Sequence, residues 1–291
     1  MIGEHPMKCS SLVTVGLALV AAGLMGVALT GCGSSAAQTE GAQAGEAKPQ
    51  PKTSPSDPVE GPGKGMAAIK QAADAGKYLF MFFSKSDDGQ TVAMRKVFDK
   101  AMEKVQDRAQ SVAVNITDAS EKAIVDKFDL SRAPMPLVLA MAPNGAITGG
   151  FPTRFEEEEL LDAFATPAME KVMKALQDGK LVFVCVQNGK TTASDAAMQG
   201  VRDFKADARF ASATEIVMLD PTDKKEAKFL TDLRVSPDIA VATTVVIVPP
   251  GQAIAQIEGP TTKDKLIELL SKANTGCGPG GCGPGGCGPR R

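Results

Sequence analysis

Cysteine is the residue with the most chemistry to offer in this 291-residue chain, and three of its six cysteines recur at the C-terminus. The chain ends in GCGPGGCGPGGCGPRR, which places Cys277, Cys282 and Cys287 five residues apart among glycine and proline. Thiolates bind soft metal ions such as Cu(I) and Zn, and exposed thiols exchange disulfides in oxidising compartments. Because glycine and proline favour turns, cysteines at this spacing can approach one another. This tail is the first candidate for chemistry.

Three interpretations of the tail stay open. In the first, the thiolates of Cys277, Cys282 and Cys287 bind Cu(I) or Zn, although the CxxxxC spacing is wider than the CxxC of tight zinc sites. In the second, the tail carries out thiol–disulfide exchange, and its odd number of thiols leaves one for an intermolecular bond. In the third, it is an expanded repeat without specific chemistry, tolerated because it is terminal.

The N-terminus predicts export. Lys8 is followed by an apolar run over 12–29 and by LTGC, which ends at Cys32. A charged start, an apolar run and small residues before a cleavage site are typical of a secretory signal peptide. LTGC also resembles the bacterial lipobox, which implies that residues 1–31 are removed and that Cys32 becomes the lipid-bearing first residue. The alternative is a transmembrane anchor, since the run is just long enough to span.

These features predict a location and exclude several function classes. The lipobox resemblance implies a lipid-anchored protein of the bacterial cell envelope that faces the periplasm, and Gly33 after the cysteine favours the outer membrane. Removal of the signal peptide takes away His5, the only histidine, so that Ser-His-Asp triads and histidine metal sites are excluded from the mature chain. The net charge of -2, without a basic block, gives no reason to expect nucleic acid.

The composition divides the rest of the chain. Residues 32–64 are rich in Gly, Ala, Pro and Ser and predict a disordered tether. Beyond it, apolar runs and helical spacing predict a regular order of elements. Strands are expected over 78–83, 111–116, 137–142, 147–151, 181–186, 215–219, 243–248 and 253–259. Helices are expected over 66–77, 91–106, 118–128, 156–165, 168–180, 191–207, 221–233 and 262–273.

The element order occurs twice, which indicates an internal duplication of about 100–105 residues. DAGK (74–77) and QDGK (177–180) each precede an apolar strand, and APNGAI and VPPGQAI mark two equivalent hairpin turns. We therefore expect two tandem domains, 65–166 and 167–274, followed by the tail over 275–291.

Both units resemble the thioredoxin superfamily. The segments that carry the resemblance are YLFMFF and FDLSRAPMPLVLAMAPNGAI in the first unit and LRVSPDIAVATTVVIVPPGQAI in the second. The resemblance implies two α/β domains, each a mixed sheet with helices on both faces. It also implies a cis-proline before the third strand, for which Pro134 and Pro136 are the candidates in the first unit; Pro237 is a poor match in the second.

The family's redox centre is a CxxC between the first strand and the next helix, where the helix N-terminus lowers the thiol pKa. DDGQ (87–90) and KTTA (190–193) stand there in the two units, and neither contains cysteine. Dithiol exchange at the usual site is thereby excluded. Asp87 and Asp88 are interpreted as helix-capping residues. Thioredoxin-like domains without redox cysteines typically bind peptides or partner proteins, so the resemblance implies a protein or peptide partner.

Cys185 lies within the apolar strand LVFVCV, where a free cysteine behaves as a small hydrophobe. The sequence thus predicts a membrane-anchored envelope binding or scaffold protein with redox-inactive thioredoxin-like domains and a thiol tail that binds soft metal ions. The alternative is a thiol–disulfide exchange protein that uses the tail cysteines. This oxidoreductase is the only enzyme hypothesis that the residues support.

Overall fold

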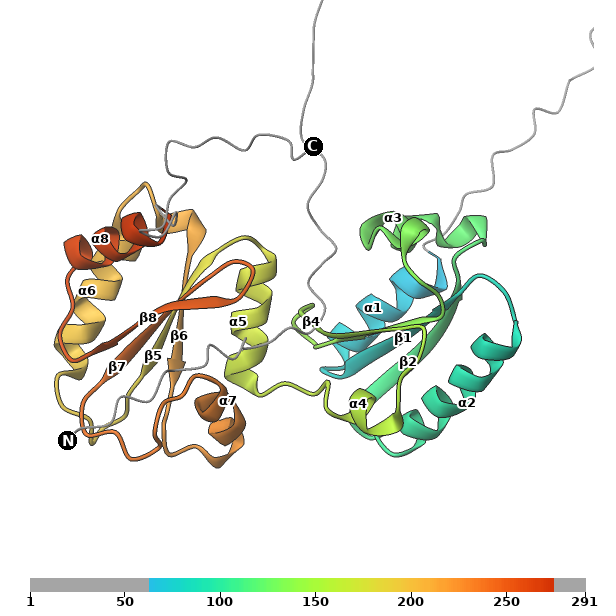
Figure 1. Cartoon of the computed structure of the whole chain (residues 1–291), viewed down its shortest axis with the longest axis horizontal. Coiled ribbons are helices and arrows are strands. Elements are labelled where there is room, and N and C mark those ends of the chain that lie inside the picture. Colours follow the sequence, from blue (N-terminus) through green and yellow to red (C-terminus); the bar gives the residue numbers. More distant parts are fainter. Residues whose placement is uncertain (1–62, 275–291) are drawn as a thin grey trace, which may run out of the picture.

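The computed structural model describes residues 63–274, which form two α/β domains, each built around one four-stranded sheet. Figure 1 shows the two domains side by side, with one helix, α5 (Pro167–Gln177), lying between their sheets. No helix among these residues is long and apolar enough to cross a membrane. The predicted signal peptide (1–31), the lipidation site Cys32, the tether up to residue 62 and the tail thiols lie outside the described residues. These thiols are Cys277, Cys282 and Cys287.

The elements of both domains follow the predicted order. The first domain contains α1 (Lys64–Asp74), β1 (Tyr78–Ser84), α2 (Gly89–Glu103), β2 (Ala109–Asn115), η1 (Ala119–Glu121), α3 (Lys122–Lys127), η2 (Leu130–Arg132), β3 (Leu137–Met141), β4 (Ile147–Pro152) and α4 (Glu157–Leu161). The second contains α5, β5 (Leu181–Val186), α6 (Ser194–Ala206), η3 (Ala211–Ala213), β6 (Thr214–Leu219), η4 (Lys224–Glu226), α7 (Ala227–Asp232), β7 (Thr243–Val248), β8 (Gln252–Glu258) and α8 (Lys263–Asn274).

The two sheets have the same topology. Their strand orders are β2-β1-β3-β4 and β6-β5-β7-β8. In each, the first two strands along the chain are parallel, and the last two form an antiparallel hairpin whose first strand is antiparallel to the central strand. This order, with helices on both faces, is the thioredoxin-like arrangement. The predicted fold of two tandem thioredoxin-like domains is therefore confirmed.

The central strand of the first sheet is buried on both faces, as its continuous apolar run predicts. Phe80 and Phe82 pack with Phe98 of α2 in one layer, while Leu79 and Met81 face a second layer under α1 and α3. Each of the three phenylalanine side chains is at most 1% exposed. The two helices α2 and α1 therefore cover opposite faces of this strand.

Unusual backbone conformations repeat between the domains. Left-handed φ angles occur at Gly76 and Gly179 before the central strands, and at Asp129 and Arg234 after the helices α3 and α7. They recur in the hairpin turns, at Gly145 and Gly251. Only glycine adopts such angles without a steric cost, so their recurrence at equivalent places supports an internal duplication.

Three helices differ most from their predicted bounds. The helix expected over 221–233 is α-helical only from Ala227, after the 3-10 turn η4. The helix expected over 118–128 begins as the 3-10 turn η1, because Glu121 turns inward and accepts the N–H of Gly65 (3.0 Å) at the start of α1. The same device recurs in the second domain, where Glu226 accepts the N–H of Ala168 (2.9 Å). The helix expected over 156–165 ends at Leu161, since the following residues turn back to pack against the first domain.

Candidate functional site

In the first domain, a helix cap occupies the loop between β1 and α2, where the resemblance places a redox centre. Asp88 is the N-cap of α2, and its carboxylate accepts the N–H of Thr91 (2.8 Å) and the hydroxyl of Ser86 (3.1 Å). The Thr91 hydrogen bond holds the pKa of Asp88 below its usual value. The side chain of Gln90 reaches the carbonyl of Thr153 after β4 (2.9 Å). Asp88 is therefore a helix-capping residue, as predicted, and both oxygens of its carboxylate accept hydrogen bonds.

In the second domain, the equivalent loop is joined to the segment before β7. Thr192 donates its N–H to the carbonyl of Ala240 (2.9 Å), and its own carbonyl accepts the N–H of Ala242 (3.0 Å). The hydroxyls of Thr191 and Ser194 lie 2.9 Å apart and bond each other. The hydroxyls and main-chain groups named here thus have partners within the domain, whereas α6 itself begins after Ala193 without a side-chain cap.

Cys185 is the one free cysteine among residues 63–274, and it is buried in β5. Burial raises the pKa of its thiol to about 11, which keeps it protonated at neutral pH. Cys185 is therefore part of the hydrophobic core, as predicted. The described residues also contain no group of three or more His, Cys, Asp or Glu side chains that could hold a metal ion.

The candidate cis-prolines lie on the segment before β3. The peptide bond between Met135 and Pro136 is cis, and the bond before Pro134 is not. In the second domain, Pro237 does not follow a cis bond either, and β7 is preceded by Ala242. A second cis bond, between Pro249 and Pro250, lies in the β7–β8 turn.

A polar contact joins the two domains beside the connector, residues 162–166, which leads from α4 to α5. The hydroxyl of Tyr78 in β1 donates to the Glu170 carboxylate in α5 (2.6 Å) and accepts the N–H of Ala165 (2.9 Å). Burial raises the pKa of both side chains, Tyr78 and Glu170. Next to them, the Phe164 ring packs on Tyr78 and carries the guanidinium of Arg108 3.8 Å above it. The connector is therefore held to the first domain.

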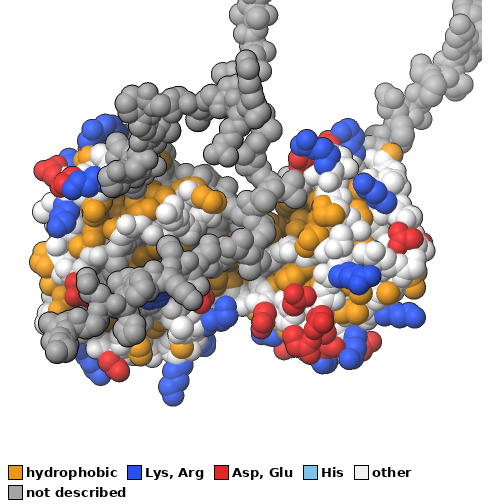
Figure 2. Space-filling model, viewed as in Figure 1, with side chains coloured by type: hydrophobic (Ala, Val, Ile, Leu, Met, Phe, Trp, Pro, Cys, Tyr) orange, Lys and Arg blue, Asp and Glu red, His pale blue; other side chains and the backbone are white. Residues whose placement is uncertain are grey.

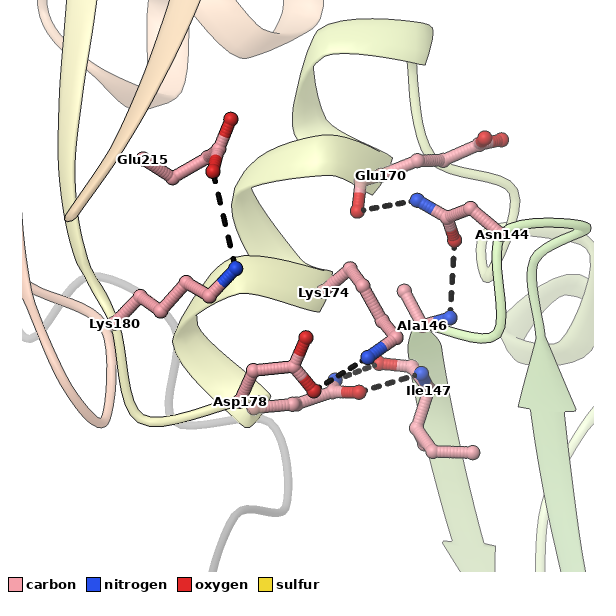
Figure 3. A network of polar contacts seen from close by, with 9 residues as sticks. Asn144, Ala146, Ile147, Glu170, Lys174, Asp178, Lys180 and Glu215 are labelled. Atoms are coloured by element: carbon pink, nitrogen blue, oxygen red, sulfur yellow. Dashed lines mark hydrogen bonds and ion pairs between the residues drawn. The ribbon is translucent and has the colours of Figure 1, made fainter. Parts of the chain in front are cut away.

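Helix α5 also binds the β3–β4 hairpin of the first domain (Figure 3). The carboxamide of Gln177 accepts the N–H of Ile147 (2.9 Å) and donates to its carbonyl (2.7 Å), as a neighbouring strand would. Asn144 donates to the main-chain carbonyl of Glu170 (2.9 Å), and its own oxygen accepts the N–H of Ala146 (3.0 Å). The hairpin is thus fastened to both ends of one face of α5.

An apolar groove of about 410 Å³ lies along this junction. Its walls come from β4, α5, α7 and the β7–β8 hairpin, and its main apolar residues are Ile147, Met169, Met173, Leu176, Leu233 and Ile254. Met173 packs against the core of the first domain, whereas Met169 and Leu176 pack against that of the second. Figure 2 shows hydrophobic side chains around β4 and on the β8 side of the second domain, with an acidic group apart from them near α4.

Sequence reasoning did not find this groove. Its residues come from both units and are up to about a hundred positions apart, so no local motif marks it. The only available signals were the two hairpin turns and the pair Gly149–Gly150 in β4, since glycine within a strand often marks a close approach of another backbone.

No protein-family model and no curated protein matches this chain. Among solved structures, it is similar to thioredoxin O1 from Arabidopsis thaliana (14% identity, 35% of this chain, 88% of that chain, TM-score 0.29). It is also similar to the first two thioredoxin domains of Eps1p from Saccharomyces cerevisiae (10% identity, 77% of this chain, 99% of that chain, TM-score 0.26). The fold assignment itself rests on the strand order and pairing described above.

Proposed function

We propose that this chain is a lipid-anchored binding protein of the bacterial cell envelope whose thioredoxin-like domains hold partners and do not exchange disulfides. The observation that carries the proposal is the contrast between two places in the fold. The loops before α2 and α6, where the family has its redox cysteines, carry Asp88 and Thr191 with their hydrogen bonds made. An apolar groove of about 410 Å³, by contrast, lies between the domains.

The first test separates binding from redox chemistry. Reduction of insulin disulfides in the presence of dithiothreitol is measured with the full chain and with a variant in which Cys277, Cys282 and Cys287 are serine. We expect neither protein to accelerate the reaction. Acceleration that disappears in the serine variant would favour disulfide exchange by the tail, and acceleration that persists would contradict the proposal for the folded domains.

The anchor is tested in cells. The wild-type chain and Cys32→Ser are expressed in a Gram-negative bacterium, and inner and outer membranes are separated. We expect the wild type in the outer-membrane fraction and Cys32→Ser with its signal segment uncleaved, because the lipoprotein pathway requires the cysteine. Identical processing and distribution of the two proteins would refute lipidation at Cys32.

The tail is proposed to bind soft metal ions through Cys277, Cys282 and Cys287, since thiolates prefer Cu(I) and Zn. Anaerobic titration of Cu(I) into the reduced chain, beside the triple serine variant, measures this directly. We expect a thiolate-to-copper absorption band in the wild type that is missing from the variant. Equal binding by both proteins would overturn this part of the proposal.

A further inference from the structure

Strand β8 leaves its outer edge open. Gly259 donates its N–H to the carbonyl of Ala242 (2.8 Å), and the register continues along β7 and β8 up to a bulge near Ala253. Because bonded and non-bonded pairs alternate along an antiparallel ladder, the main-chain groups of Gln256 and Glu258 point away from β7. No other described residue accepts from or donates to these groups. The second sheet therefore ends in unpaired amides.

The equivalent strand of the first domain is protected. On β4, the outward N–H and carbonyl of Ile147 are taken by Gln177, and Pro152 has no N–H to offer. Only Gly150 keeps outward main-chain groups there. Natural proteins block the edges of sheets in these ways, with covering side chains and proline. The edge of β8 lacks this protection, so its main-chain groups can pair with a strand of another molecule.

The open edge of β8 borders the apolar groove. Ala253 and Gln256 line it together with Gly150 of β4, and the apolar side chains of α5 and Leu233 form its other wall. A neighbouring strand lies about 4.8 Å away and places alternate side chains on the two faces of the sheet. A strand added at β8 would therefore direct every second side chain toward this wall. The groove volume of about 410 Å³ lies within the range of ligand sites.

The side chain of Arg234 places a positive charge beside the same groove. Arg234 lines it and is exposed, and its guanidinium forms no ion pair among the described residues. The nearby Asp232 already faces Lys228 (3.7 Å). Arg234 is thus available for a carboxylate that arrives with the ligand, because guanidinium and carboxylate groups form paired hydrogen bonds.

We propose that the groove takes an extended peptide with apolar side chains at alternate positions and a carboxylate near Arg234, added as a fifth strand at the free edge of β8. This inference rests on the proposed binding function and names its site and partner class. Strand addition of this kind obtains affinity from main-chain hydrogen bonds and specificity from the pockets for alternate side chains. A single strand fits an edge that borders this groove better than a second copy of the chain, which would bring helices on both faces of its own sheet.

The probe is a fluorescein-labelled peptide of seven residues, alternating Val and Thr, with a free C-terminal carboxylate, and binding to the full chain is followed by fluorescence anisotropy. Gln256→Pro removes the outward N–H without removing a ladder hydrogen bond, so it is compatible with an edge strand. Gln256→Ala, which keeps this N–H, is the matched control. We expect Gln256→Pro to weaken binding about tenfold, from one lost hydrogen bond and the bulk of the ring, and Gln256→Ala to bind as the wild type.

Two further experiments change the main chain of the peptide and the charge of Arg234. N-methylation of the peptide on one edge should abolish binding, and N-methylation on the other edge should leave it within about twofold, since only one edge pairs with β8. Arg234→Asn keeps a residue that tolerates the left-handed backbone (φ 58°) and should weaken binding of the free acid but not of the C-terminal amide. If Gln256→Pro does not fold, judged by its thermal melt, these two experiments decide alone.

Several results would overturn the inference. One is a wild type that fails to bind the peptide, whether or not the groove binds a fatty acid such as dodecanoate. Another is loss of binding to the same extent on methylation of either peptide edge. A dimer that ultracentrifugation detects in the wild type and not in Gln256→Pro would assign the edge to a second copy. Equal binding by Gln256→Pro and Gln256→Ala would move the peptide elsewhere and leave the proposed binding function standing.

Discussion

The two hydrogen bonds between Gln177 and Ile147 give the sharpest prediction about how the domains are joined. Gln177→Ala removes both, and nothing else in the described part of the chain reaches this N–H. A hydrogen bond contributes about 1 kcal/mol net, and these two are exposed to solvent, so we expect a loss of about 1–2 kcal/mol in the local free energy of opening. At about 1.4 kcal/mol per factor of ten, the Ile147 amide should exchange with solvent roughly 5- to 30-fold faster.

The measurement is residue-resolved hydrogen exchange by NMR at a pH where exchange follows the opening equilibrium. Gln199→Ala is the matched control, because Gln199 is also on a helix and makes one local hydrogen bond, to Asp203 (2.7 Å), within α6. We expect the control to leave Ile147 unchanged. An Ile147 amide that exchanges within twofold of the wild-type rate in Gln177→Ala would refute the view that this carboxamide acts as a strand neighbour and holds the hairpin to α5.

Four further predictions concern the domains. Arg209 and Lys263 hold the pKa of Asp207 below its usual value of 3.8. The stability that the Asp207 carboxylate contributes is therefore present above pH 3.8 and is lost as the pH falls below that value. The urea midpoint of Asp207→Asn, measured against pH, should lack this part of the acid dependence. Cys185 should resist Ellman's reagent at pH 8 in a variant whose other cysteines are serine, and react fully in 6 M guanidinium; reaction in the native protein would contradict its burial. Gly200→Ala should destabilise the chain by about 1–3 kcal/mol in urea melts, since the new Cβ would lie 2.2 Å from the carbonyl oxygen of Thr261, whereas Gly189→Ala, with open space around it, should be neutral. Glu226→Ala should cost about 1–3 kcal/mol because it leaves the N–H of Ala168 buried without its acceptor; a value near zero would argue against the capping role.

The sheet order and the duplication could be predicted because they depend on local patterns. Continuous apolar runs such as YLFMFF mark strands that are covered on both faces, and the repeated turn sequences mark where each hairpin reverses. These signals depend only on neighbours in the sequence, so they needed no knowledge of tertiary contacts. Two tandem α/β domains follow from them, and the resemblance of the quoted segments to the thioredoxin superfamily implied their topology.

The helix ends and the groove could not be predicted, because distant residues decide them. Glu121 stands where a helix start is expected, but its carboxylate accepts the N–H of Gly65 at the start of α1, 56 positions earlier in the chain. Gln177 is an ordinary exposed helix residue until β4 lies beside it. The open edge of β8 is visible only after β4 is seen to be blocked, since the two strands have the same place in the repeat.

Amide hydrogen exchange of the full chain, with and without the seven-residue peptide at saturation, tests most directly whether partners bind between the domains. We expect slowed exchange at the outward amides of β8, Gln256 and Glu258, and unchanged exchange at the starts of α2 and α6. Slowed exchange at the starts of α2 or α6, with the β8 amides unaffected, would contradict this expectation.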